Sequence, residues 1–161
     1  MRASQESYGS VAWTAFNKRI DNKPVINQAE NTWTAENLPA WLRIDYPRAM
    51  QVLSYSISSW TRANRVYFPV VWRLEGSNDG TVWSTLGTYS LLDNNNTFVG
   101  SWAAGETKTF TVPHSHLFSK FRLYLINSVM TNDVRDVRSD FHVAISEWRL
   151  NPNENIQLQF G

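Results

Sequence analysis

The segment from residue 58 to residue 68 gathers side chains that are suited to binding a ligand. It combines aromatic rings with hydrogen-bonding groups, in the residues Trp60, Arg62, Asn64, Arg65 and Tyr67. Aromatic rings supply sugar-stacking or interface surface as well as core packing, and guanidinium and amide groups donate hydrogen bonds. The segment has more aromatic and hydrogen-bonding capacity than a loop that only connects two strands needs. Strands are expected to hold it at both ends, and binding residues commonly lie on loops that a rigid scaffold positions. We predict that this segment forms a binding face with the loops Lys18–Asn31 and Asn94–Trp102; the alternative is that its rings only cover the rim of the core.

The histidines His114 and His116 are a candidate pair of zinc ligands. Alternate residues of a strand share one face, so both imidazoles could point toward one ion. Pro113 precedes the pair and favours a turn, and two histidines without a third ligand rarely hold zinc. We therefore expect no metal there.

Three aspartates between residues 127 and 140 are the residue type that glycoside hydrolysis uses in pairs, namely Asp133, Asp136 and Asp140. Arg135 and Arg138 are interleaved with them, so solvated ion pairs are the better interpretation. The sequence contains no glycine-rich phosphate loop, nucleophile elbow or Cys–His pair. We therefore predict that the protein is not an enzyme.

Composition narrows the range of partners. Only 18% of the 161 residues are charged and the net charge is +1, which gives no broad attraction to nucleic acid or to a membrane surface. The absence of cysteine removes any disulfide framework and any thiol catalysis. No apolar run approaches the roughly 20 residues that span a bilayer, and residues 1–7 lack the apolar core of a secretion signal. We therefore expect no nucleic-acid binding and no membrane insertion. If the protein is exported, we expect it to use another route or to have lost its signal.

Strands must position the loops described above. The run Val70–Glu75 has the period of a half-buried strand, with Val70, Trp72 and Leu74 on one face. The dipeptide Asp79-Gly80 separates it from a second run, Val82–Leu86, and Asp-Gly between two such runs is a strong hairpin signal. We predict a hairpin here, with Trp72 and Leu74 in the core.

Further runs have strand character and are separated by turn signals. They are Pro39–Tyr46, Met50–Ser59, Thr107–Val112, Lys120–Ile126 and Phe141–Leu150, with Leu53, Tyr55 and Ile57 expected on one face of the second. No internal repeat and no amphipathic helix of useful length is present. Seven or eight such strands predict an all-β jelly-roll β-sandwich of about eight mostly antiparallel strands. We expect one domain over residues 1–161, with its core at 12–150 and polar termini at 1–11 and 151–161.

Several segments resemble, in the correct order, the discoidin family, also called coagulation-factor or F5/8 type C domains. The most specific is Leu74–Trp83, with the sequence LEGSNDGTVW. The shorter ones are Ala15–Asn17, Asn31–Trp33, Pro39–Asp45, Tyr55–Ile57, Phe110–Val112, Phe121–Leu123 and Ala144–Glu147. The resemblance implies an eight-stranded jelly roll of the galactose-binding type. It also implies a non-catalytic recognition module, most often for sugars in microbial and viral members.

The resemblance further implies a structural calcium ion between the first loop and the final strand. The positions that carry its oxygen ligands correspond to Ala15, Asn17, Asn31, Thr32 and Glu147. Asn17 stands where the family prefers Asp, which removes one negative charge and should weaken a site for a hard cation. Asp21 could substitute if the lengthened loop folds back. The alternative is a vestigial site whose groups only hydrogen-bond the loop backbone.

The resemblance also places a sugar site on loops at one end of the sandwich. Family members stack an aromatic face on the sugar ring and bind its hydroxyls with Arg, Asn, Glu or His. Arg62 corresponds to the family's binding arginine, and Trp60, Asn64 and Tyr67 lie in the same loop. These four residues are therefore the expected ligand contacts.

Two neighbouring loops complete this expected site. Thr34 stands where other members carry His, and Glu36 lies nearby. The missing His is a departure from the family's pattern that weakens the inference to galactose itself. Trp102 is expected to form a second stacking platform. For each of these aromatic residues the alternative is a rim residue that covers the core.

Two function classes follow. The first is a module that binds cell-surface glycans through its loops, at an extracellular or virion surface, where it would serve host attachment. The second is a structural or assembly domain of a phage tail, baseplate or capsid decoration layer, with self-association or other virion proteins as its partners. Clustered aromatic loops favour the first class, and we expect a glycan or glycoconjugate as the partner.

Overall fold

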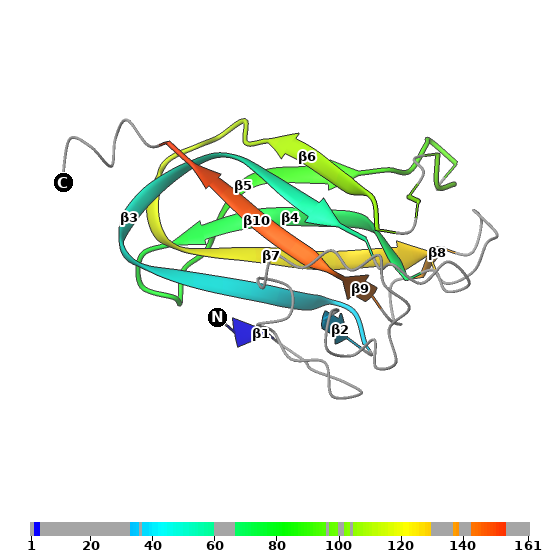
Figure 1. Ribbon diagram of the computed structural model, residues 1–161, viewed down its shortest axis with the longest axis horizontal. Helices are drawn as coiled ribbons and strands as arrows, with labels where there is room; N and C mark the ends of the chain where they lie inside the picture. Colours follow the sequence, from blue (N-terminus) through cyan, green and yellow to red (C-terminus); the bar gives the residue numbers. More distant parts are fainter. Residues whose placement is uncertain are drawn as a thin grey trace.

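The computed structural model describes residues 2–3, 33–35, 37–59, 67–95, 97–99, 102–103, 105–129, 137–138 and 143–153. Within these ranges every regular element is a strand (Figure 1). The strands are β1 (Arg2–Ala3), β2 (Trp33–Ala35), β3 (Ala40–Ser58), β4 (Phe68–Ser77), β5 (Ser84–Ser90), β6 (Thr107–Thr111), β7 (Leu117–Val129), β8 (Val137–Arg138), β9 (Val143–Ile145) and β10 (Glu147–Pro152). The described part of the chain contains no helix of the length and apolar character that a membrane crossing requires.

Antiparallel pairing joins these strands into a curled sandwich. One sheet runs in the order β1-β3-β7-β4-β5, and β8 extends it beside β7. Both β6 and β10 pair with β3, while β2 and β9 form a separate two-stranded sheet. This arrangement confirms the predicted all-β sandwich.

The long strand β3 connects the two layers. Its first part pairs with β7, from Ala40 opposite Leu125 to Gln51 opposite Leu117. Its second part lies between β6 and β10, and Figure 1 shows β3 bending round one end of the molecule. The two strands expected at 39–46 and 50–59 are therefore one strand, with a register shift between Asp45 and Met50.

The expected inward position of Leu53 is wrong. Leu53 is 46% exposed, whereas Val52 and Tyr55 are buried. Pro152 pairs with Val52 and the adjacent Asn151 pairs with Ser54, so Leu53 is an extra residue on β3. A bulge of this kind inserts one residue into the alternation and reverses its phase.

The final expected strand, Phe141–Leu150, also divides. β9 pairs with β2 and β10 pairs with β3, with Ser146 between them. The Ser146 amide donates to the Ser58 carbonyl at 2.9 Å, so the break remains attached to β3. The single apolar run of the sequence therefore forms two strands, which pair with two different strands, β2 and β3.

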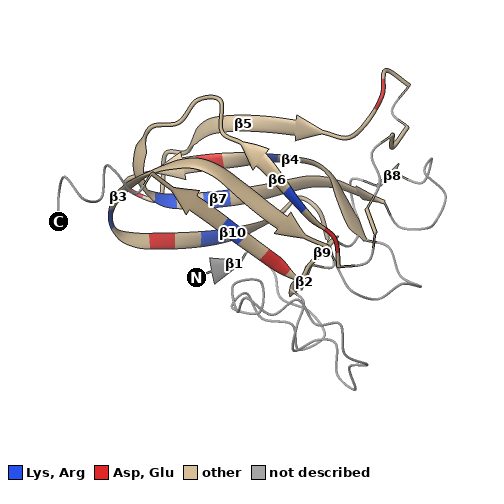
Figure 2. Cartoon of the chain, turned by 45° about the horizontal axis from the view of Figure 1, so that its top comes forward, with Lys and Arg blue, Asp and Glu red and all other residues tan. Residues whose placement is uncertain are grey.

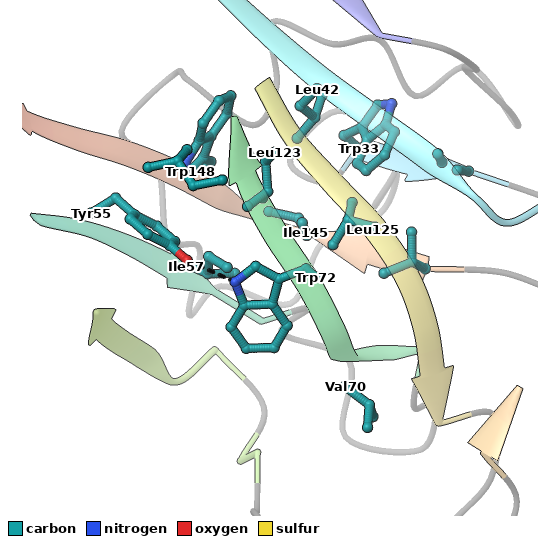
Figure 3. Packing of buried hydrophobic residues seen from close by; sticks show 14 of the residues in the cluster. Trp33, Leu42, Tyr55, Ile57, Val70, Trp72, Leu123, Leu125, Ile145 and Trp148 are labelled. Atoms are coloured by element: carbon teal, nitrogen blue, oxygen red, sulfur yellow. Dashed lines mark hydrogen bonds between the residues drawn. The ribbon is translucent and has the colours of Figure 1, made fainter. Parts of the chain in front are cut away.

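The core confirms the predicted inward face of the central hairpin. Trp72 and Leu74 are fully buried, and the Trp72 indole N–H donates to the Tyr55 hydroxyl at 2.8 Å (Figure 3). The Tyr89 ring stacks on Trp72 and Phe110 meets it edge-on. Burial raises the pKa of Tyr55 above its ordinary value, so its hydroxyl stays neutral.

The predicted turn between β4 and β5 is also confirmed. Gly80 has φ of 76°, a backbone conformation that favours glycine. One carboxylate oxygen of Asp79 accepts hydrogen bonds from the Thr81 and Val82 amides at 2.8 and 2.9 Å. These amide donors hold the pKa of Asp79 below its ordinary value. The turn therefore depends on local side-chain chemistry.

Candidate functional site

The segment 60–66 begins and ends at residues that are held by the core. The Ser59 amide donates to the Glu106 carbonyl at 2.9 Å, and the Ser59 hydroxyl donates to the Ala103 carbonyl at 2.6 Å. At the other end, the Tyr67 amide donates to the Val129 carbonyl at 2.9 Å, and the Tyr67 carbonyl accepts from the Ala144 amide at 3.0 Å. The prediction that the core holds both ends of this loop is confirmed.

Tyr67 has an unusual backbone conformation. Its φ is 117°, a value that is rare for a residue with a side chain. Such a conformation costs about 1–3 kcal/mol and persists only where the surroundings impose it, often at binding sites. The two backbone hydrogen bonds to Val129 and Ala144 impose it here, and the Tyr67 side chain is half-buried.

The described ends of other loops meet at the same place. The Trp102 indole N–H donates to the Pro69 carbonyl at 2.9 Å, beside the start of β4. Thr34, which follows the loop Lys18–Asn31, pairs with Ala144, the residue that holds Tyr67. We call this end of the sandwich, marked by Ser59, Tyr67, Trp102 and Ala144, the loop end; β3 ends there and β4 begins there (Figure 1). The described residues that flank the first segment, Ser59 and Tyr67, thus lie at the same end as Trp102, the last residue of the second. Residues 60–66, 100–101 and Lys18–Asn31 lie outside the described residues, so the binding face itself stays a prediction.

Trp102 does not present an open face. Its side chain is 7% exposed, with the Phe68 ring centroid 6.4 Å from its own and the Lys108 ammonium 5.1 Å from its ring. The ring is occupied by these neighbours, which corrects the expectation that it is a second stacking platform. Thr34, in the position where the family has His, is buried in β2.

Most of the other predicted site residues lie outside the part of the chain that the structure describes. For the sugar site these are Glu36, Trp60, Arg62 and Asn64, and for the calcium site they are Ala15, Asn17, Asp21, Asn31 and Thr32. Glu147 is described: it opens β10 opposite Ser58 and is 3% exposed. One of its carboxylate oxygens lies 4.0 Å from the Arg149 guanidinium. Among the described residues, no group of three or more His, Cys, Asp or Glu gathers around a common point.

Sequence reasoning missed a second group of clustered charged and aromatic side chains. They point outward from β3, β7 and β4, where charged residues form neighbouring bands (Figure 2), and they lie beside aromatic rings. We call this group the outer face; its central members are Trp41, Arg43, Arg73, Glu75, Arg122 and Tyr124. Each strand carries two of them at alternate positions, a pattern that is also typical of an ordinary solvent-facing side. Only the pairing of three distant strands assembles them.

Comparison with known proteins identifies the fold. No family model matches the sequence, and no curated protein matches it. The family 32 carbohydrate-binding module of Clostridium perfringens NanJ, in complex with galactose, has 17% identity and a TM-score of 0.59 over 92% of this chain and 89% of that chain. The F5/8 type C domain of a Bacteroides fragilis protein has 13% identity and a TM-score of 0.63, over 92% and 87%.

A third similar structure is the family 32 module of AlyQ in complex with 4,5-unsaturated mannuronic acid. It has 9% identity and a TM-score of 0.60, over 92% of this chain and 91% of that chain. At these identities the likeness is one of fold. The chain has the β-sandwich fold of the F5/8 type C domains and family 32 carbohydrate-binding modules, as its sequence resemblance predicted.

Proposed function

We propose that this chain is a non-catalytic glycan-binding module that recognises sugars through its loop end. The observation that carries the proposal is the enforced conformation of Tyr67, with φ of 117° and a hydrogen bond on each side. A strained residue held by the core is a feature of binding sites more than of connectors. The side chains of the adjoining segment 60–66 are those that stack on sugars and bind hydroxyls.

The similar structures support this class of ligand. One is a complex with galactose and another is a complex with a mannuronic acid. One fold therefore carries sites for a neutral sugar and for an acidic one. For this chain we propose shallow contacts through Trp60, Arg62, Asn64 and Tyr67 that are weak singly and are strengthened by multivalency. The module would act at an extracellular surface, where such glycans lie.

A glycan array tests the proposal with three proteins beside the wild type. Trp60→Ala removes a stacking ring and Arg62→Ala removes a hydroxyl-binding group, so each should weaken binding at least about tenfold, or about 1.4 kcal/mol. Val82→Ala is the matched control, because Val82 is 69% exposed and follows the β4–β5 turn at the opposite end. Thermal melts of all four proteins should coincide. Undiminished binding by both loop variants would contradict the proposal.

The same variants distinguish the assembly function. If the loop end is a contact between copies, Trp60→Ala should shift the mass in light scattering, and neither protein should bind glycans. Attachment of a virion to its host remains a prediction from the sequence, because the similar structures reported above are bacterial modules or an AlyQ module.

We also propose that Glu147 supplies the carboxylate of a structural calcium site. Its side chain is almost fully buried where β10 begins, and a carboxylate oxygen is the ligand type that a hard cation prefers. Calcium that binds only the folded protein should raise its melting temperature. Glu147→Gln should abolish the rise, whereas Glu106→Gln, at a half-buried glutamate on another loop, should preserve it. No rise at millimolar calcium would contradict the proposal.

A further inference from the structure

The outer face is an ordered array across three strands. Antiparallel pairing places its members in two transverse rows: Trp41, Tyr124 and Arg73 in one, and Arg43, Arg122 and Glu75 in the next. Neighbouring strands lie about 4.8 Å apart, so each row spans about 10 Å. The array therefore extends across the outward side of three strands.

Guanidinium groups and aromatic rings are layered on this surface. The Arg122 guanidinium carbon lies 4.3 Å from the Trp83 ring centroid and 5.2 Å from that of Tyr124. Arg73 lies 4.3 Å from the Tyr124 ring, and Arg43 lies 5.4 Å from the Trp83 ring. Trp83 comes from the end of the β4–β5 turn, which folds over the sheet at this point. Cation–π contacts of this kind attract a guanidinium group to the face of an aromatic ring.

The array breaks a rule of sheet pairing. Arg43 and Arg122 lie directly opposite each other on β3 and β7, and like charges in that position are destabilising. Glu75 compensates: it accepts from Arg122 at 2.8 Å and from Arg73 at 3.0 Å. Asp45 accepts from Arg43 at 2.8 and 3.1 Å. Local rules that are broken and then compensated are expected at functional or strained sites.

A net positive charge remains after these ion pairs form. Lys120, 3.5 Å from Asp45, adds a fourth cation to the three arginines, while Asp45 and Glu75 are the two carboxylates. The excess is two positive charges on one face of a chain whose total is +1. The hydrogen bond from Arg43 holds the pKa of Asp45 below its ordinary value, so this balance persists at neutral pH. Arg73 is the most accessible of the three outer-face arginines, with 35% of its side chain exposed against 13% for Arg43 and 18% for Arg122.

We propose that the outer face is a second glycan-binding site, separate from the loop end, and that it takes a polyuronate chain. A carboxylate on each sugar ring matches the two-donor geometry of arginine, and the aromatic rings hold the guanidinium groups that would bind it. Arg43 already binds the Asp45 carboxylate through two nitrogens in this way. An array that extends across three strands suits the side of an extended polymer rather than its end. This site does not depend on the loop-end proposal.

Binding of polygalacturonate tests the proposal, measured by titration calorimetry in a chelating buffer at low and high salt. Arg73→Gln and Trp83→Leu should each weaken binding about tenfold and should keep the folded far-UV spectrum. Arg73→Gln should also reduce the salt dependence, because it removes one charge contact. Lys108→Gln removes a cation from β6, in the other layer, and should leave binding unchanged. Trp60→Ala should bind polygalacturonate like the wild type.

Several outcomes would overturn the proposal. Equal weakening by Lys108→Gln, or equal binding of poly-L-glutamate, would show that only net charge is sensed. Loss of polygalacturonate binding in Trp60→Ala would place the acidic ligand at the loop end instead. A wild-type dimer in light scattering that becomes a monomer in Arg73→Gln would assign the face to a second copy. Binding of neutral glycans alone would refute this site and leave the loop-end proposal standing.

Discussion

The two faces of the strands β3, β7 and β4 are built from alternate residues of the same backbone, yet they work by different physics. On the inner face Trp72, Leu74 and Leu123 are fully buried, and their stabilisation is non-directional and grows with the apolar area removed from water. On the outer face Arg73 and Arg122 donate directional hydrogen bonds to Glu75 and make cation–π contacts with Tyr124. We therefore expect the inner face to contribute more of the stability than the outer face does.

Glu75 shows how far tertiary contacts modify a face. Its position in β4 makes it an outward residue, yet only 4% of it is exposed. The arginines at 73 and 122 cover it from both sides and satisfy both its oxygens. An outward strand position can thus become a buried one when long charged neighbours lie across it.

Trp72→Ala should have the largest effect. Removing a fully buried indole should destabilise the fold by about 3–5 kcal/mol, because neighbours such as Tyr89 and Phe110 cannot fill the space. Chemical denaturation measures this loss. Arg73→Ala, one residue away on the opposite face, should cost less than about 1 kcal/mol. Similar losses for both would remove the distinction between the two faces.

Glu75→Gln should have the next largest effect and tests how the outer face holds itself together. The amide cannot neutralise two guanidinium groups, so a loss of about 1–3 kcal/mol is expected. Urea denaturation of Glu75→Gln, Arg73→Gln and the double variant forms a thermodynamic cycle. A zero coupling energy between residues 73 and 75 would mean that their 3.0 Å contact contributes nothing.

Gly80→Ala should cost about 1–2 kcal/mol, because φ of 76° is unfavourable for a residue with a side chain. A Cβ atom at residue 80 would also lie 2.8 Å from the end of the Arg43 side chain. Gly80→Asn separates the two causes, since Asn adopts positive φ more readily but still carries a Cβ atom. If the melting temperature of Gly80→Ala equals that of the wild type, the turn has been assigned wrongly.

Asp45→Asn should have the smallest effect, below about 1 kcal/mol at neutral pH, since the ion pair is partly exposed. The pKa of Asp45 is lowered in the folded protein, chiefly by the hydrogen bond from Arg43. Its stabilisation is therefore complete above the ordinary value of 3.8 and is lost as the pH falls below it. Melts of both proteins across that range should converge in acid; a difference that persists there would require another origin.

The sequence predicted local features well. The period-2 pattern located the inward residues of β4, and Asp79-Gly80 located its turn, because both signals act within a few residues. Features that depend on a distant partner were predicted less well. The burial of Trp102 depends on Phe68 and on a hydrogen bond to Pro69 across more than 30 residues of chain.

The sequence by itself determined the class of fold, the central hairpin and the chemistry that the chain can offer to a ligand. The tertiary structure alone decided that β3 serves both layers, that Leu53 is an extra residue, and that Trp102 is buried. It alone also placed Arg43, Arg73 and Arg122 on one surface. The physical reason is that alternation is a property of one strand, whereas register is a property of two. A local pattern in the sequence therefore does not determine which strands pair.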